Sequence, residues 1–130
     1  MKLQTILLAG ILSATIASAD TMTKSMNMMQ KGIEQVQFGF VNNNEEMIRE
    51  GLAEIKKGNT MFSSDSVIKA SLPNDKKHMV NVAANASKRI AADATIIELN
   101  LDDKAYTKAA QGYADMVNAC SRCHGIIRSW

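Results

Sequence analysis

The sequence predicts an all-α protein, a bundle of four helices, and three features favour this fold. Apolar residues recur at alternating spacings of three and four over four long stretches, which is the period of an amphipathic helix. Turn-forming clusters of asparagine, aspartate, serine or glycine separate these stretches. The alternation typical of strands is not found around them. Four amphipathic helices bury their apolar stripes against one another in a bundle.

The chain begins with the pattern of a secretory signal peptide. Lys2 gives a charged start, an apolar run extends from Leu3 to Ile16, and Ala17-Ser18-Ala19 forms a small-x-small cleavage site. We therefore expect residues 1–19 to be removed, which leaves one domain at 20–130, exported to the periplasm and without a membrane anchor. A retained anchor is the alternative, although the apolar run is short for a bilayer.

The first two helices of the mature chain are expected on either side of an asparagine turn. The first runs from Asp20 to Phe40, and its apolar stripe is Met22, Met26, Met29, Ile33, Val36 and Phe40. Asn44 is the expected N-cap of the second, with Glu45 and Glu46 in the first turn, where the helix dipole favours acids. Lys56-Lys57-Gly58-Asn59 is expected to end it, because cations and glycine are typical of helix C-termini.

The periodicity fails between Thr60 and Asn74, so we expect a long connection there. Pro73 fixes a turn, a short helical piece is expected near Val67 and Ile68, and Phe62 is expected to point inward. A third helix then runs from Asp75 to about Leu99.

The fourth helix is expected to continue to the C-terminus. Its turn and N-cap are predicted at Asn100, Asp102 and Asp103. Its stripe is Tyr106, Ala110, Tyr113, Val117, Cys120 and His124. His78, near the start of the third helix, is interpreted as a surface residue.

Cys120-Ser121-Arg122-Cys123-His124 is the attachment signature of a c-type haem. One helical turn can present both thiols to the two vinyl groups, and the neutral imidazole of His124 can bind the iron. The alternatives are a redox disulfide and half of a zinc site, but zinc needs four ligands and only His78 remains. A thioredoxin-like use requires the cysteines near a helix start in a βαβ unit. We therefore expect one covalent haem c.

The ending His124-Gly125-Ile126-Ile127-Arg128, in an exported four-helix chain, resembles the cytochrome c′ family over essentially the whole mature chain. The resemblance implies an antiparallel bundle with haem near the C-terminal end of helix four, and a homodimer through helices one and two. The chain departs from the family pattern at Ile127, where an aromatic residue is usual, and has no arginine ahead of the first-helix methionines.

Two branches of the family differ at the sixth iron position. One leaves it open and binds nitric oxide or carbon monoxide, and the other fills it with methionine and transfers electrons. Because helix one starts beside the end of helix four in such a bundle, Met26 is our expected distal ligand opposite the proximal His124. Met22 and Met29 share its face and are the alternatives, and a stripe that is only core packing leaves the site open.

We expect an electron-transfer protein and not an enzyme. A five-coordinate gas-binding protein is the second interpretation, and a small helical protein with a CxxC disulfide is the third. The residues expected around the haem are Arg128, Phe62 and Tyr113.

The expected partners are redox proteins and a second copy of the chain. The sequence has 15 Lys and Arg against 13 Asp and Glu, which gives no strong field for nucleic acid. Phe38 and Met28 are large apolar residues off the main stripe and are candidates for the dimer interface. We expect a small basic set near the haem-bearing end, made of Arg122, Arg128 and Lys104 or Lys108. This set could steer an acidic partner.

Overall fold

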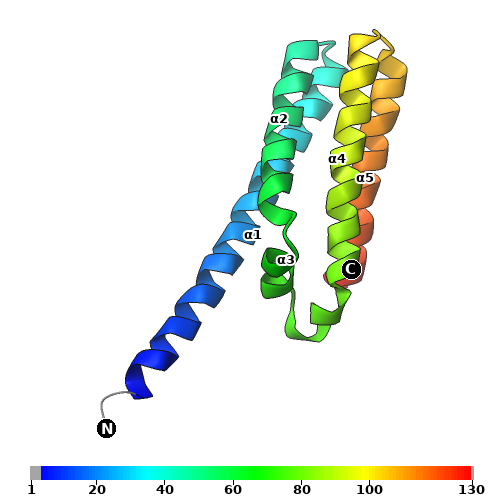
Figure 1. Ribbon diagram of the computed structural model, residues 1–130. Coiled ribbons are helices and arrows are strands. Elements are labelled where there is room, and N and C mark those ends of the chain that lie inside the picture. The colour runs from blue at the N-terminus through cyan, green and yellow to red at the C-terminus, as the bar shows by residue number, and fades with distance from the viewer. Residues whose placement is uncertain (1–3, 130) are drawn as a thin grey trace.

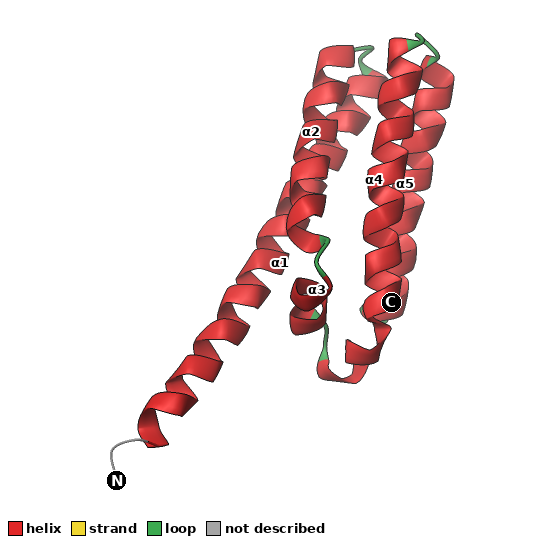
Figure 2. Cartoon of the chain, in the orientation of Figure 1, coloured by secondary structure: helices red, strands yellow, loops and turns green. Residues whose placement is uncertain are grey.

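The computed structural model describes residues 4–129, with side chains from residue 20 onward, and the regular structure of this part is entirely helical (Figure 2). The all-α class is thereby confirmed. In chain order the elements are α1 Gln4–Val41, α2 Glu45–Phe62, α3 Asp65–Ser71, the 3-10 helix η1 Asn74–Met79, α4 Val80–Asp102 and α5 Tyr106–Ile127. The side chains of the predicted signal segment, residues 1–19, lie outside the description. None of the described helices has an apolar stretch long enough to cross a membrane.

The long helices form two hairpins that lie side by side (Figure 1). α1 packs along α2, α4 packs along α5, and α2 also contacts α4. The turns at residues 42–44 and 103–105 lie at one end, which we call the turn end. α3, η1 and the last turns of α5 lie at the other, which we call the crossover end. The CxxCH motif is therefore at the crossover end.

Several local predictions are confirmed by the structure. The Asn44 side chain accepts a hydrogen bond from the Met47 amide at 3.0 Å and so caps α2. The short helical piece is present as α3, and Phe62 is buried. His78 is exposed on η1.

The predicted end of the second helix at Lys56–Asn59 is wrong, since α2 continues to Phe62. Gly58 is a packing position in this helix and not its end. A Cβ on Gly58 would lie 2.9 Å from the Ser25 carbonyl oxygen, and the Ser25 hydroxyl donates to the Gly58 carbonyl at 2.7 Å. The glycine is thus explained by the close approach of α1, which the local sequence pattern does not reveal.

The predicted N-cap of the fourth helix is wrong, because Ala105 is the N-cap of α5 and Asn100 and Asp102 belong to the end of α4. Asp103 lies in the turn, as predicted. α4 ends later than the predicted Leu99 because Leu101, one turn after Ile97, is fully buried in helical register. It also begins later than the predicted Asp75, at Val80, because residues 74–79 form the 3-10 helix η1. Lys104 ends the helix with a φ of 55°, and two hydrogen bonds close the turn. The Lys104 amide donates to the Leu101 carbonyl at 3.0 Å, and the Ala105 amide to the Asn100 carbonyl at 2.7 Å.

Candidate functional site

The last turns of α5 carry two half-buried cysteines with free thiols, Cys120 and Cys123. Their spacing places them one helical turn apart on neighbouring positions of one face. Burial raises the pKa of both thiols, and the nearby Cys123 raises that of Cys120 further. Both groups are therefore neutral thiols at neutral pH.

His124 follows the cysteines and is also half-buried. Burial lowers the pKa of its imidazole, and the positive charge of Arg128 lowers it further. The neutral ring is therefore favoured, which is the form that binds a metal. The His124 carbonyl accepts the Arg128 amide at 2.8 Å, which closes the end of α5.

His124 lines a cavity of about 400 Å³ at the crossover end, which we call the histidine pocket. Its walls come from α1, the end of α2, the α3–η1 connection, α4 and α5. The lining residues are Met22, Thr23, Met26, Asn27, Phe62, Ser71, Leu72, Pro73, Ala83, Cys123, His124, Ile127 and Arg128. Concave sites that hold small molecules and cofactors have volumes of about 300–1,000 Å³.

The three candidate methionines of α1 occupy two different environments. Met22 and Met26 are half-buried and line the histidine pocket. Met29 is only 4% exposed, and its Cγ would lie 2.8 Å from a Cβ on Gly58. Met29 thus packs between α1 and α2, and the pocket brings Met26 and Met22 together with His124.

The remaining predicted site residues also fall into two groups, those that line the histidine pocket and those that do not. Phe62 and Arg128 line the histidine pocket, whereas Tyr113 and Cys120 do not. The Tyr113 hydroxyl donates to the Ile33 carbonyl at 3.4 Å, and its ring centroid lies 6.0 Å from that of Phe40.

Sequence reasoning missed one apolar wall of the pocket. Leu72, in the connection between α3 and η1, is 7% exposed and lines the pocket beside Pro73. The only sign of this role in the sequence is that Leu72 is an apolar residue directly before Pro73, in a stretch without helical periodicity.

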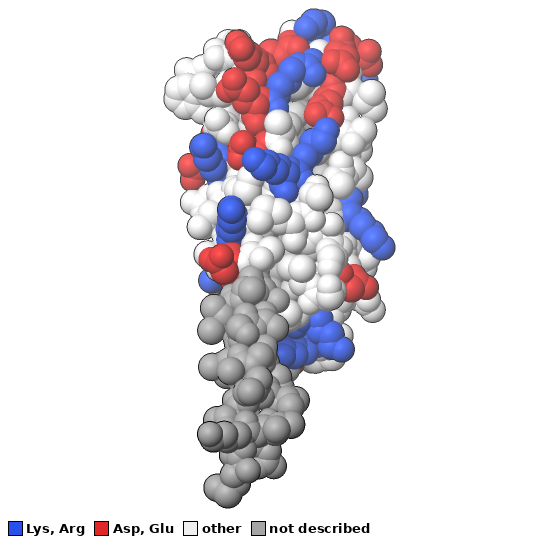
Figure 3. Space-filling view, turned by 60° about the vertical axis from the view of Figure 1, so that its left-hand side comes forward, with Lys and Arg blue, Asp and Glu red and all other residues white. Residues whose placement is uncertain are grey.

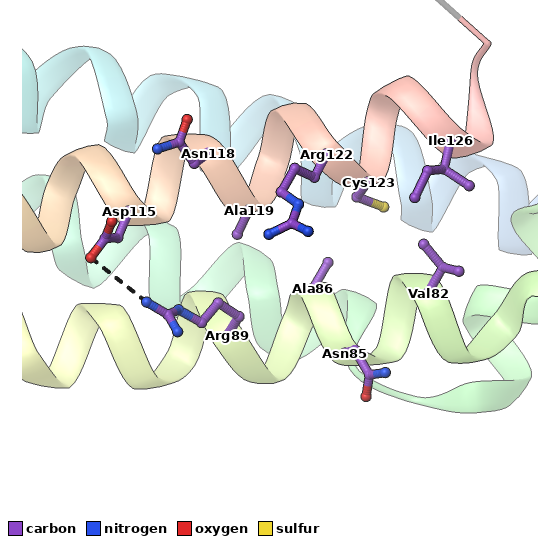
Figure 4. Close-up of a pocket in the computed structure, with 10 residues that line it drawn as sticks. All are labelled: Val82, Asn85, Ala86, Arg89, Asp115, Asn118, Ala119, Arg122, Cys123 and Ile126. Carbon is purple, nitrogen blue, oxygen red and sulfur yellow. Dashed lines mark ion pairs between the residues drawn. The ribbon is translucent and has the colours of Figure 1, made fainter.

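A second cavity, the α4–α5 groove, has a volume of about 530 Å³ and meets the histidine pocket at Cys123, which lines both. The groove residues are Val82, Asn85, Ala86, Arg89, Asp115, Asn118, Ala119, Arg122, Cys123 and Ile126 (Figure 4). The Nε of Arg89 donates to the buried Asp93 carboxylate at 2.9 Å, and its Nη2 lies 3.7 Å from the Asp115 carboxylate. Arg122 reaches from α5 over Ala119 toward α4 in the same view.

The basic residues predicted near the motif are separated in the structure. Arg122 and Arg128 lie at the crossover end with the cysteines, at the end of α5. Lys104 lies at the turn end, where its Nζ is 3.0 Å from Glu45 Oε2, and Lys108 follows in the first turns of α5. The prediction that these two lysines lie near the motif is wrong, because α5 places them and the motif at opposite ends.

The donors gathered around the histidine pocket fit a covalently attached haem. Cys123, His124, Met22 and Met26 line the pocket, and the Cys120 thiol lies one helical turn before Cys123, outside the lining. Residues 20–129 contain no group of three or more His, Cys, Asp or Glu side chains placed to hold a metal ion. No protein-family model, curated protein or solved structure matches the chain.

Proposed function

We propose that this chain is a periplasmic monohaem c-type cytochrome that carries one electron between redox partners. The two hairpins then form an antiparallel four-helix bundle with haem near the C-terminal end of the fourth long helix, α5. One observation carries the proposal: the end of α5 places a CxxCH motif beside a pocket whose α1 wall presents Met26.

The residues of the pocket have separate roles in this proposal. Cys120 and Cys123 hold the haem through thioether bonds, while His124 and Met26 are the iron ligands. When bound, the haem supplies an iron centre that gains and loses one electron. A nitrogen and a thioether hold both oxidation states with little rearrangement, which favours electron transfer over binding of a substrate at the iron.

The apolar walls of the pocket support the same role. Phe62, Leu72 and Ala83 are all buried and line the pocket together with the proposed ligands. These side chains exclude water from one side of the site, and burial of this kind is one of the factors that set a haem potential.

Mass spectrometry of the exported protein tests the attachment. We expect a chain that begins at Asp20 and carries the added mass of one haem. The Cys120→Ala, Cys123→Ala double variant should lack this mass, whereas Ser121→Ala, between the cysteines, should keep it. A mature wild-type chain without added mass would show that the CxxC has another use, such as a disulfide.

The coordination state separates the electron carrier from the gas-binding alternative. We expect the oxidised protein to be low-spin, with a weak near-infrared sulfur-to-iron band, and the reduced protein to bind carbon monoxide slowly. A high-spin protein that binds carbon monoxide at once would instead identify a five-coordinate gas-binding cytochrome.

A further inference from the structure

The histidine pocket contains one more soft donor than the proposed haem uses. Met26 and His124 are the proposed iron ligands, whereas Met22 lines the same pocket and has no task in that proposal. Met22 and Met26 are both half-buried, and their spacing places them one turn apart on one face of α1. Two thioethers and one imidazole therefore line a single cavity of about 400 Å³.

This donor set suits a soft metal ion. Thioethers favour Cu(I), and imidazole also binds copper, whereas carboxylate oxygens suit Mg²⁺ and Ca²⁺. No Asp or Glu is among the described residues that line the pocket. On the face shown in Figure 3, most acidic side chains gather toward the turn end, while the pocket lies at the crossover end. The pocket therefore offers ligands to Cu(I) and few to a hard ion.

Charge and burial favour a monovalent ion in the same place. Arg128 lines the cavity, and its repulsion of a cation is proportional to the charge of that cation. A monovalent ion is therefore repelled less than Cu(II) or Zn(II) at the same position. Buried Phe62 and Leu72 form apolar walls, which limit the access of water that would compete with the thioethers.

We propose that the chain without haem binds one Cu(I) ion in the histidine pocket, through the thioethers of Met22 and Met26 and the imidazole of His124. The ligands come from α1 and α5, so the ion links the two hairpins at the crossover end. Copper and the proposed haem exclude each other, because both use Met26 and His124. The inference does not depend on haem attachment and is tested separately from electron transfer.

The test uses residues 20–130 with both motif cysteines replaced by alanine, because this chain cannot attach haem and has no thiol to bind copper. Anaerobic titration with Cu(I), in competition with the coloured chelator bicinchoninate, measures the dissociation constant. We expect one ion per chain. Met22→Leu, Met26→Leu and His124→Asn should each raise the dissociation constant at least about tenfold, since loss of a group that only orients a metal ligand already costs about 10–100-fold. Leucine keeps the approximate volume of methionine.

Met28→Leu and His78→Asn are the matched controls. Half-buried Met28 lies on α1 and exposed His78 on η1, both outside the pocket. Each should leave the dissociation constant for Cu(I) unchanged. Zn(II), which proteins bind through cysteine, histidine and carboxylates, should bind the parent chain far more weakly than Cu(I) does.

Several outcomes would overturn the copper site. Absence of Cu(I) binding, or a Met22→Leu, Met26→Leu double variant that binds Cu(I) as tightly as its parent, would show that the thioethers hold no ion. Equal affinities for Zn(II) and Cu(I) would do the same. A chain whose far-UV circular dichroism remains that of an unfolded protein with Cu(I) present would also refute the site, because only the fold brings α1 and α5 together. None of these results bears on haem attachment, which mass spectrometry decides.

Discussion

At the scale of single residues, Met26 decides what the proposed haem can do. Met26→Ala should convert a low-spin, gas-resistant centre into a high-spin one that binds carbon monoxide rapidly, because the thioether no longer fills the sixth position. Absorption spectra and carbon monoxide binding rates measure this. Met22→Ala is the matched control on the same pocket wall and should leave the spin state unchanged. If only Met22→Ala opens the site, the ligand lies one helical turn away and electron transfer still stands.

Met29 should behave differently from both, because it packs in the core between α1 and α2. Met29→Ala should lower the free energy of unfolding by about 2–5 kcal/mol, as expected when a buried side chain leaves a cavity. Denaturant unfolding measures this, with half-buried Met28→Ala as the neighbouring control of smaller effect. A high-spin Met29→Ala protein of normal stability would assign the ligand to Met29.

The motif was readable from the sequence because its residues are adjacent in the chain. The distal ligand could not be chosen from the sequence in the same way. Residues three and four apart share one helical face, so periodicity alone does not distinguish Met22, Met26 and Met29. What separates Met29 from Met26 is Gly58, which lets α2 approach α1 and enclose Met29. That contact joins residues far apart in the chain, so no local pattern contains it.

At the scale of helices, glycines set how closely α1 and α2 pack. A Cβ on Gly51 would lie 2.6 Å from the Gly32 carbonyl oxygen and 2.9 Å from the Val36 amide nitrogen, and such backbone atoms cannot move aside individually. Gly51→Ala should therefore lower the free energy of unfolding by about 2 kcal/mol, although alanine favours a helix by about 1 kcal/mol.

Gly112→Ala in α5 is the matched substitution. Its nearest contact would be a side-chain atom, Ile97 Cγ1, at 3.0 Å. A side-chain atom can shift, so the variant should stay within about 1 kcal/mol of the wild type. Equal losses in Gly51→Ala and Gly112→Ala by denaturant unfolding would contradict close backbone packing as the cause.

The turn end joins the two hairpins through Glu45, and this contact should depend on pH. Hydrogen bonds from Arg49 and then Lys104 hold the pKa of Glu45 at about 2, below its ordinary value of 4.5. A lowered pKa stabilises the folded state above about pH 4.5, and this contribution disappears as the pH falls through about 2.

Glu45→Gln should therefore be less stable than the wild type at pH 7, and the difference should vanish near pH 2. Urea unfolding across this range measures it, and added salt should reduce the difference. Glu46→Gln, in the same first helical turn, is the control without an ion pair in the described part of the chain. If the difference in unfolding free energy between the wild type and Glu45→Gln stayed constant from pH 7 to pH 2, the role of the Glu45 charge would be contradicted.

Helix existence was predictable at this scale, while the end of α2 and both ends of α4 were not. The signals at Lys56–Asn59 and at Asn100–Asp103 are those of termini, yet both segments contain residues that packing holds in a helix. Burial of Leu101 and the approach of α1 to Gly58 outweigh local propensities, which amount to about 1 kcal/mol or less per residue.

At the scale of the whole molecule, the two ends have different tasks in our proposals. Ion pairs of Arg49 with Asp102 and of Lys104 with Glu45 connect the hairpins at the turn end. The residues proposed to hold the haem lie at the crossover end. The outer faces of the hairpins therefore take no part in the proposed electron transfer and remain available for other contacts.

The outer face of α1 is where we expect a second copy of the chain to bind. Phe38 and Val41, one turn apart, are 57% and 75% exposed. Sedimentation at micromolar concentration should show a dimer, and Phe38→Ser should raise its dissociation constant roughly 30-fold, since a buried interface aromatic contributes about 2 kcal/mol. Leu99→Ser is the matched control, because Leu99 is 59% exposed on α4, away from this face. A wild-type monomer, or equal effects of Phe38→Ser and Leu99→Ser, would show that these α1 residues are solitary surface apolars, which are common on monomeric proteins.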